Sequence, residues 1–200
     1  MPGEIVGILL AAGRGTRFGS DKRLHPLADG TPMAVAAARN LRPACDRLIA
    51  VLRPGSETLA GLLAAEGCET VICAEADSGM GHTLAAGVRA SPEALGWVVA
   101  LADMPFIAPA SHQAVAASLR AGASLAACAF EGRRGHPVGF ASAWFEALAS
   151  LTGDQGGKPI LQAHRQGLVL CPVDDPGVLR DVDRVEDVLS VGGSYPPASE

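Results

Sequence analysis

The chain has 200 residues, of which 48% are hydrophobic and 18% are charged, and its formal net charge at pH 7 is -5. This length and composition can bury a full core, which excludes an intrinsically disordered chain. The acidic balance disfavours nucleic acid and anionic membranes as partners, because both require a basic excess.

Short apolar runs alternate with alanine-rich segments of helical length, and glycine or proline marks most of the joins. This alternation predicts βαβ units in a sheet that is covered on both faces. The expected strands are 5–11, 48–52, 70–73, 97–101, 125–130, 138–140 and 169–172. The expected helices are 33–41, 57–66, 81–89, 111–120, 143–151 and 158–165, with Ser56, Ser111 and Ser142 as N-caps. We therefore expect one α/β domain over residues 1–191 and a loose tail over residues 192–200.

Two features bear on the compartment of the protein. The longest apolar stretches, 8–12 and 97–102, are much shorter than the roughly 20 residues that cross a bilayer, and the N-terminus has no basic leader. The five cysteines are an odd number and lack the spacing of a metal site. We expect a cytoplasmic protein without a membrane span, whose cysteines are buried free thiols.

The first apolar run continues into a glycine-rich loop that extends to Lys22. Glycine lets the backbone approach an anion closely, and successive exposed N–H groups form a concave anion site. Arg17 and Lys22 would add full positive charges. Lysine occurs at only two of the sixteen basic positions, Lys22 and Lys158, both in glycine-rich segments, which suggests that a compact ammonium group is needed there.

The same loop also partly matches a dinucleotide-binding motif. Gly13 and Gly15 have the G-x-G spacing, but the third glycine, Gly19, comes one residue late, and the second strand ends in Arg53 instead of an acidic residue. The spacing of a Walker A loop also fails. A nicotinamide-dependent oxidoreductase is disfavoured and stays open as an alternative.

Carboxylates follow at two places. Asp103 comes at the end of a buried strand, at the sheet edge where ligands bind, and it would hold Mg²⁺ beside the glycine-rich loop. A turn before Pro105 is the alternative role of Asp103. Asp181 and Asp183 alternate, so that one of them is a candidate second ligand, and helix capping by Asp183 is its alternative.

Three further segments are rich in glycine. Residues 79–84 lead into a helix and offer backbone amides to a base or a ribose, and residues 153–159 form a loop that would close on a substrate. Residues 132–140 contain a basic turn with Arg133 and Arg134, which would grip a phosphate or form a solvated hairpin tip. His136 is not needed as a base, because a phosphate oxygen attacks without losing a proton.

Together these segments resemble the MobA-like nucleotidyltransferases, and most closely the molybdenum cofactor cytidylyltransferases. The matches lie in the family's order at residues 10–22, 79–84, 103–105, 134–140, 153–156 and 181–183. The resemblance implies a doubly wound, mostly parallel α/β sheet with a Rossmann-like arrangement, helices on both faces and one antiparallel strand. It also implies Mg²⁺-dependent transfer of CMP from CTP to the terminal phosphate of Mo-molybdopterin, with release of pyrophosphate.

The resemblance also implies a role for each matching residue. Arg17 and Lys22 would hold the triphosphate as catalytic residues, and Asp103, also catalytic, would hold Mg²⁺ with Asp183. The implied nucleotide contacts are Leu10, Ala11, Ala12, Gly13, Arg14, Gly15, Gly79, Met80, Gly81 and Thr83. The implied molybdopterin contacts are Arg134, Gly135, His136, Pro137, Asp154 and Lys158.

The choice of nucleotide depends on Ala12, which stands where guanylyltransferase relatives carry glycine. The extra methyl group would narrow the base pocket and favour cytosine over guanine. Three features of the chain depart from the family's pattern. Thr83 stands where serine is usual, and Lys158 stands where arginine is common. The segment Asp183-Arg184-Val185-Glu186 stands where Asp-Thr-Pro-Glu is typical. Three further alternative functions stay open: guanylyl transfer from GTP, cytidylyl transfer to another phosphorylated small molecule, and non-catalytic nucleotide carriage. A labile product also suggests transient contact with a molybdoenzyme or its chaperone.

Overall fold

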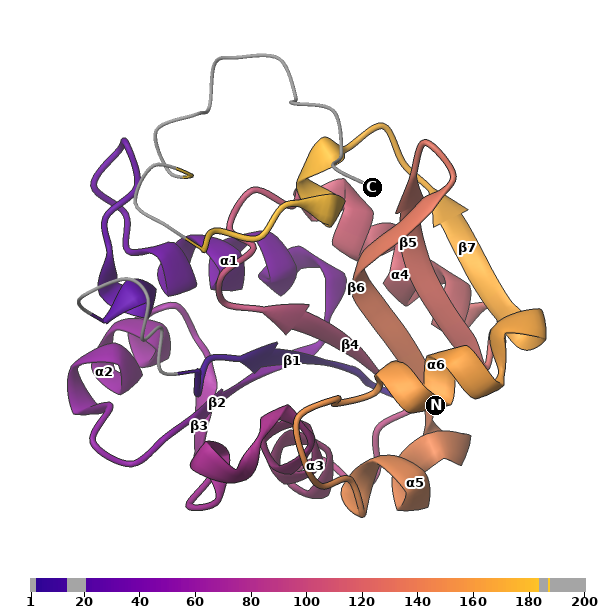
Figure 1. Cartoon of the computed structure of the whole chain (residues 1–200), viewed down its shortest axis with the longest axis horizontal. Coiled ribbons are helices and arrows are strands. Elements are labelled where there is room, and N and C mark those ends of the chain that lie inside the picture. Colours follow the sequence, from indigo (N-terminus) through magenta and orange to yellow (C-terminus); the bar gives the residue numbers. More distant parts are fainter. Residues whose placement is uncertain (1–2, 14–20, 184–186, 188–200) are drawn as a thin grey trace.

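The computed structural model describes residues 3–13, 21–183 and 187, and its centre is a seven-stranded sheet (Figure 1). The strands lie in the order β3-β2-β1-β4-β6-β5-β7. Their bounds are β1 Ile5–Leu10, β2 Arg47–Leu52, β3 Glu69–Ile72, β4 Gly96–Leu101, β5 Leu125–Phe130, β6 Arg133–Ala141 and β7 Leu168–Pro172. Only β6, among the described strands, runs antiparallel to its neighbours, so the expected mostly parallel sheet with one antiparallel strand is confirmed.

Helices cover both faces of the sheet, as Figure 1 shows. One core cluster contains side chains of α1 (Met33–Leu41), α2 (Glu57–Ala65) and α4 (Pro109–Arg120). The other contains side chains of α3 (Met80–Arg89), α5 (Phe145–Ala149) and α6 (Lys158–Ala163). Successive side chains of a strand point to opposite faces, so Val6 and Ile8 pack in one cluster while Ile5 and Leu9 pack in the other. This two-sided burial explains why β1 is apolar at nearly every position.

The largest difference from the expected strands is at β6, which begins at Arg133 instead of residue 138. A two-residue turn joins it to β5, and both turn residues have positive φ angles, 49° at Glu131 and 76° at Gly132. A two-residue hairpin turn of this kind matches the twist of the flanking strands, and its first position usually carries asparagine, aspartate or glycine. The expected basic turn at Arg133 and Arg134 is therefore wrong, because both residues belong to β6, and glutamate at the first turn position concealed the true turn at Glu131 and Gly132.

The predicted helices 143–151 and 158–165 are longer than the observed α5 and α6, because a short 3-10 turn precedes α5 and another follows α6. The N-cap predictions for Ser111 and Ser142 are wrong. Pro109 suits the first turn of a helix, so α4 begins two residues before Ser111, and Ser142 begins a 3-10 turn. Ser56 does occupy the N-cap position of α2, although its hydroxyl makes no capping bond.

The carboxyl ends of β1, β2 and β4 meet at one edge of the sheet. The chain leaves β1 toward β2 on one side and returns to β4 on the other, which makes this edge a topological switch point, where ligands bind in open α/β sheets. Backbone hydrogen bonds continue past the strands, from Ala11 N to Val51 O at 3.0 Å and from Ala102 N to Leu10 O at 3.1 Å. Residues 11–13 after β1 and Asp103 after β4 therefore lie at the same edge of the sheet.

Other expectations concern the cysteines, the membrane and the ends of the chain. All five cysteines are buried and free, as expected. Within the described ranges, no helix is both long enough and apolar enough to cross a membrane. The predicted tail at 192–200 lies outside the described residues, and so do Arg14, Gly15 and Arg17 of the glycine-rich loop.

Candidate active site

Two adjoining cavities open at the carboxyl edge of the sheet. The first has a volume of about 320 Å³ and lies over the ends of β1 and β4. The second, of about 370 Å³, lies over β6 and the start of α6. The residues that line both cavities are Leu10, Met80, Leu101 and Asp154. Volumes in this range suit ligands the size of a nucleotide portion or a cofactor ring system.

The first cavity contains most of the described residues predicted to contact a nucleotide. These are Leu10, Ala11, Ala12, Gly13, Met80 and Thr83, and they lie together with Lys22 and Asp103. Arg23, Met33 and Ala76 also line this cavity and were not predicted from the sequence. The described start of the glycine-rich loop, up to Gly13, and Asp103, which are about 90 residues apart in the chain, thus line the same cavity.

A buried cation lies between two carboxylates at this cavity. Lys22 is only 8% exposed, and its Nζ atom is 3.0 Å from Asp103 Oδ2 and 3.4 Å from Asp183 Oδ1. A hydrogen bond from Val182 N to Asp103 O, at 2.8 Å, holds the C-terminal segment beside the end of β4. Val182 itself is buried against Met33. The structure therefore brings together Lys22, Asp103 and Asp183.

Lys22, Asp103 and Asp183 together carry a net negative charge. Partial burial raises the pKa of the Asp181 carboxyl, and the negative charges of Asp183 and Asp103 also raise it, against the opposing effects of a backbone hydrogen bond and of Lys22. Carboxylate oxygens are the ligands that Mg²⁺ and Mn²⁺ prefer, so Asp103 and Asp183 fit a divalent metal. In the described part of the chain, no group of three or more acidic, histidine or cysteine side chains forms a metal cluster. Water and substrate phosphates would therefore complete the coordination, as is usual for Mg²⁺.

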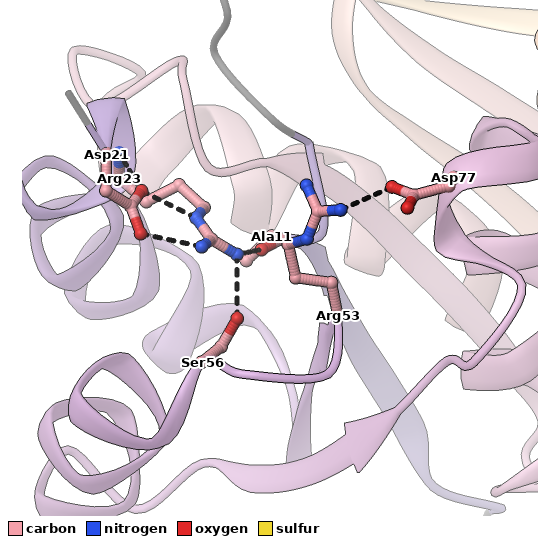
Figure 2. Close-up of polar contacts among 6 residues, drawn as sticks. All are labelled: Ala11, Asp21, Arg23, Arg53, Ser56 and Asp77. Carbon is pink, nitrogen blue, oxygen red and sulfur yellow. Dashed lines mark hydrogen bonds and ion pairs between the residues drawn. The ribbon is translucent and has the colours of Figure 1, made fainter. Parts of the chain in front are cut away.

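Arg23 fixes the 3-10 turn η1 (Lys22–Leu24), which carries Lys22, to the residue after β1 and to the N-cap of α2 (Figure 2). Its guanidinium group contacts Asp21 twice, at 2.8 and 2.6 Å, and donates from Nη1 to Ala11 O at 2.7 Å and to Ser56 Oγ at 3.2 Å. The hydrogen bonds and charge of Arg23 lower the pKa of Asp21. An arginine next to the predicted lysine gave no sign of this role in the sequence.

Arg53, at the end of β2, forms an ion pair with Asp77 of the 3-10 turn η3 (Ala76–Ser78), as Figure 2 also shows. This pair connects the end of β2 to the segment that precedes α3. In a dinucleotide-binding fold, the side chain at this position would contact the ribose. Here the guanidinium group of Arg53 is engaged by a carboxylate of the protein.

The structure gives Gly79 and Gly81 a packing role, and neither lines the first or the second cavity. A Cβ atom on Gly81 would lie 2.5 Å from Thr152 O, and one on Gly79 would lie 2.3 Å from Gly153 O. The Gly81 amide donates to Gly153 O at 2.7 Å, so it is not free to read a base. The two glycines instead let the loop at 152–154 pack against the start of α3, which places Asp154 between the two cavities.

The second cavity contains Arg134, Gly135, His136, Asp154 and Lys158, whereas Pro137 does not line it. Its apolar walls are formed by Leu84, Val99, Val138, Phe140 and Leu161. Arg134 and Lys158 are exposed and bring two positive charges to the cavity. Burial lowers the pKa of His136, so this side chain is neutral at neutral pH and has no charge with which to hold a phosphate.

Asp175 holds the segment that leads to Asp183, and it was not predicted from the sequence. Its carboxylate accepts hydrogen bonds from Gly177 N at 2.9 Å, Ala108 N at 2.8 Å and Ser111 Oγ at 2.6 Å. These bonds tie η6 (Pro176–Leu179) to the start of α4. The pattern Asp175-Pro176-Gly177 is typical of a turn stabilised by an aspartate side chain and could have indicated the first of these bonds.

The chain is similar over most of its length to two relatives of known name. The purine catabolism protein PucB of Bacillus subtilis is 28% identical, with 92% of this chain and 93% of the relative covered. The nicotine blue oxidoreductase of Paenarthrobacter nicotinovorans is 30% identical, with 92% and 94% covered.

Solved structures and a family model agree with this similarity. The crystal structure of Rv0371c from Mycobacterium tuberculosis has a TM-score of 0.77 and 31% identity, over 94% of this chain and 96% of that chain. A second structure of Rv0371c, with a TM-score of 0.74, 31% identity and coverage of 92% and 95%, is a complex with manganese. Residues 7–175 match the family model described as the MobA-like NTP transferase domain. Since this model spans far more than half of the chain, the protein belongs to the MobA-like NTP transferase family.

Proposed function

We propose that the protein is a divalent-metal-dependent cytidylyltransferase, which transfers CMP from CTP to the terminal phosphate of Mo-molybdopterin and releases pyrophosphate. One observation carries the proposal: a cavity with Lys22 and Asp103 adjoins a second, apolar cavity with Arg134 and Lys158. A reaction between two phosphorylated substrates needs two such sites, with the reacting phosphates at their junction.

The first cavity suits the nucleoside triphosphate. Ala12 lines this cavity, and its methyl group would reduce the space for a base and favour the pyrimidine of CTP over guanine. Lys22 would hold the triphosphate, together with Arg17, whose position lies outside the described residues. Direct nucleotide contacts remain predictions for Ala12, Met80 and Thr83, and for Arg14 and Gly15, which also lie outside the described residues.

The second cavity suits the acceptor. Its apolar walls, which include Val138 and Phe140, would contact a flat heterocycle, and the charges of Arg134 and Lys158 would hold its phosphate. A labile acceptor of this kind also implies transient contact with the molybdoenzyme that receives the product, or with its chaperone.

In the proposed reaction, an oxygen of the acceptor phosphate attacks the α-phosphorus of CTP and forms a new P–O bond. The bond from the α-phosphorus to the bridging oxygen breaks, and pyrophosphate leaves with the electron pair. The attacking oxygen is already ionised at neutral pH, so no base is required, in agreement with a neutral, half-buried His136. A metal held by Asp103 and Asp183 would neutralise negative charge that develops on the phosphate oxygens. Positioning and charge neutralisation would then supply the catalysis. The manganese complex of Rv0371c supports a divalent metal.

A redox reaction is the second candidate, because one relative is named as an oxidoreductase. The late third glycine and the engagement of Arg53 by Asp77 argue against a nicotinamide cofactor in this chain.

The test measures pyrophosphate release with Mo-molybdopterin and either CTP or GTP, and thermal unfolding with CTP, GTP or NADPH in the presence of Mg²⁺. A ligand at 100 times its dissociation constant stabilises by about 2.7 kcal/mol, which raises Tm by about 5 to 10 °C here. We expect release and a Tm shift with CTP, and Ala12→Gly should relax the preference toward GTP. Release with GTP alone would move the assignment to guanylyl transfer. A shift with NADPH alone, without pyrophosphate release, would favour the redox candidate.

A further inference from the structure

We propose that Lys22 takes the place of the metal ion in the free enzyme, so that metal and nucleotide must bind together. The proposal rests on the metal and phosphate roles given under the proposed function. Its starting point is the geometry: Lys22 Nζ lies 3.0 Å from Asp103 and 3.4 Å from Asp183, which are the two carboxylates assigned to the metal. One cation therefore already occupies the space between the two proposed ligands.

A divalent metal and the Lys22 ammonium group compete for the same oxygens. Two like charges a few ångströms apart repel each other, and water at the Asp103 and Asp183 side chains, which are 36% and 58% exposed, screens only part of this repulsion. Lys22 is 8% exposed, so an ammonium group that lost both carboxylates would be left nearly buried without them. Binding of the metal alone is therefore opposed in the free enzyme.

The triphosphate of the nucleotide removes this opposition. It is strongly anionic, and it binds in the cavity that Lys22 lines. Lys22 can exchange its carboxylate partners for phosphate oxygens, and the carboxylates then become available to the metal. Because coupling between two ligands is reciprocal, the nucleotide should raise the affinity for the metal and the metal should raise the affinity for the nucleotide.

The exchange requires movement of one side chain and not of the turn that carries it. The backbone of η1 is held by Asp21, whose Oδ1 accepts from Arg23 N at 3.1 Å, and by the bonds of the Arg23 guanidinium group to Ala11 and Ser56. A lysine has a flexible stem of four carbons and three rotatable donors, so its ammonium group can change partners while its backbone stays in place.

The first test measures Mn²⁺ affinity without nucleotide, for which EPR of the free ion is the readout. We expect Lys22→Met to bind Mn²⁺ at least about tenfold more tightly than the wild type, because the competing cation is gone. Lys158→Met is the matched control, since it removes the other lysine of the chain, and its Mn²⁺ affinity should equal that of the wild type. Asp103→Asn in the Lys22→Met background should abolish the tight binding.

The second test needs no substitution in the site. The chain has two lysines, so limited acetylation followed by peptide mass spectrometry reports on each amine separately, with the exposed Lys158 as the internal reference. We expect Lys22 to be protected in the free enzyme, to react faster with saturating Mn²⁺ alone, and to be protected again when CTP is added to Mn²⁺.

The outcomes separate this inference from the proposed function. If Lys22→Met binds Mn²⁺ no more tightly than the wild type while Asp103→Asn weakens binding, the metal site stands and the inference is wrong. If Mn²⁺ binds equally well after Asp103→Asn, the metal assignment fails and the inference fails with it. Acetylation of Lys22 that does not change with Mn²⁺ also overturns the inference.

Discussion

Replacement of Arg23 by methionine tests whether the buried arginine holds the turn that carries Lys22. Methionine keeps an unbranched apolar side chain and removes all of the contacts of the guanidinium group with Asp21, Ala11 and Ser56. Loss of one partner of a buried charge pair costs about 3 to 5 kcal/mol. The Asp21 side chain is 35% exposed, so water will compensate part of this loss, and we expect destabilisation by about 2 to 4 kcal/mol.

The control for Arg23→Met is Arg39→Met. Arg39 contacts Glu66 with the same two-pronged geometry, at 3.0 and 2.7 Å, but its side chain is 54% exposed. An exposed pair contributes about 0 to 1 kcal/mol, so the two substitutions differ in burial and in the additional hydrogen bonds of Arg23 to Ala11 and Ser56.

Thermal unfolding followed by circular dichroism gives the comparison. For a chain of this size, 1 kcal/mol corresponds to roughly 2 to 4 °C, so Tm should fall by about 5 to 15 °C for Arg23→Met and by less than about 4 °C for Arg39→Met. Arg23→Lys keeps the positive charge but not the planar guanidinium group with its several donors, so it should recover only part of the lost Tm. Equal Tm values for Arg23→Met and Arg39→Met would refute the anchoring role of Arg23.

Three further predictions concern the chemistry, the packing and the pH dependence. Lys22→Ala and Asp103→Ala should each lower the rate of pyrophosphate release at least about 10²-fold, because each removes a group proposed to contact the reacting phosphates or their metal. Folded variants with wild-type rates would show that the site is elsewhere. Gly81→Ala should destabilise the protein by about 1 to 3 kcal/mol in urea unfolding, because the new Cβ would lie 2.5 Å from Thr152 O. The control Gly61→Ala places a Cβ in open space on α2 and should stabilise the protein by about 0.5 to 1 kcal/mol. Equal effects of the two substitutions would contradict the packing role of Gly81. Burial lowers the pKa of His112 to about 4, so this side chain binds a proton more readily in the unfolded chain than in the folded protein. As the pH is lowered from 6.5 to 4, the free energy of unfolding should therefore decrease by at most about 1.4 kcal/mol per pH unit. His112→Gln should reduce this slope, and identical slopes would show that His112 is not the cause.

Much of the fold and part of the site follow from local patterns in the chain. The apolar run of β1 and the glycines after it predict a buried strand that ends in an anion site, and the first cavity contains four residues of this segment, Leu10 to Gly13. The strand before Asp103 likewise predicts a carboxylate at the ligand-binding edge, and Asp103 lines the same cavity. These predictions succeed because strand direction and glycine content act over a few neighbouring residues.

Other roles could be assigned only once distant segments were in contact. Gly79 and Gly81 belong to a glycine motif that indicated nucleotide contact, yet their missing side chains make room for the loop at 152–154, more than 70 residues away. Arg23 resembles a solvated basic residue in the sequence, and only the fold encloses it between the end of β1 and the start of α2.

The sequence by itself determined the class of the sheet, the glycine-rich loop and the identity of the charged residues near the site. Only the tertiary structure decided that Asp183 and Lys22, 161 residues apart in the chain, form an ion pair at 3.4 Å beside Asp103. The physical reason is that hydrophobic periodicity and turn chemistry depend on neighbouring residues. Charge pairing across the chain depends on where the buried anchors Asp175 and Val182 place the C-terminal segment.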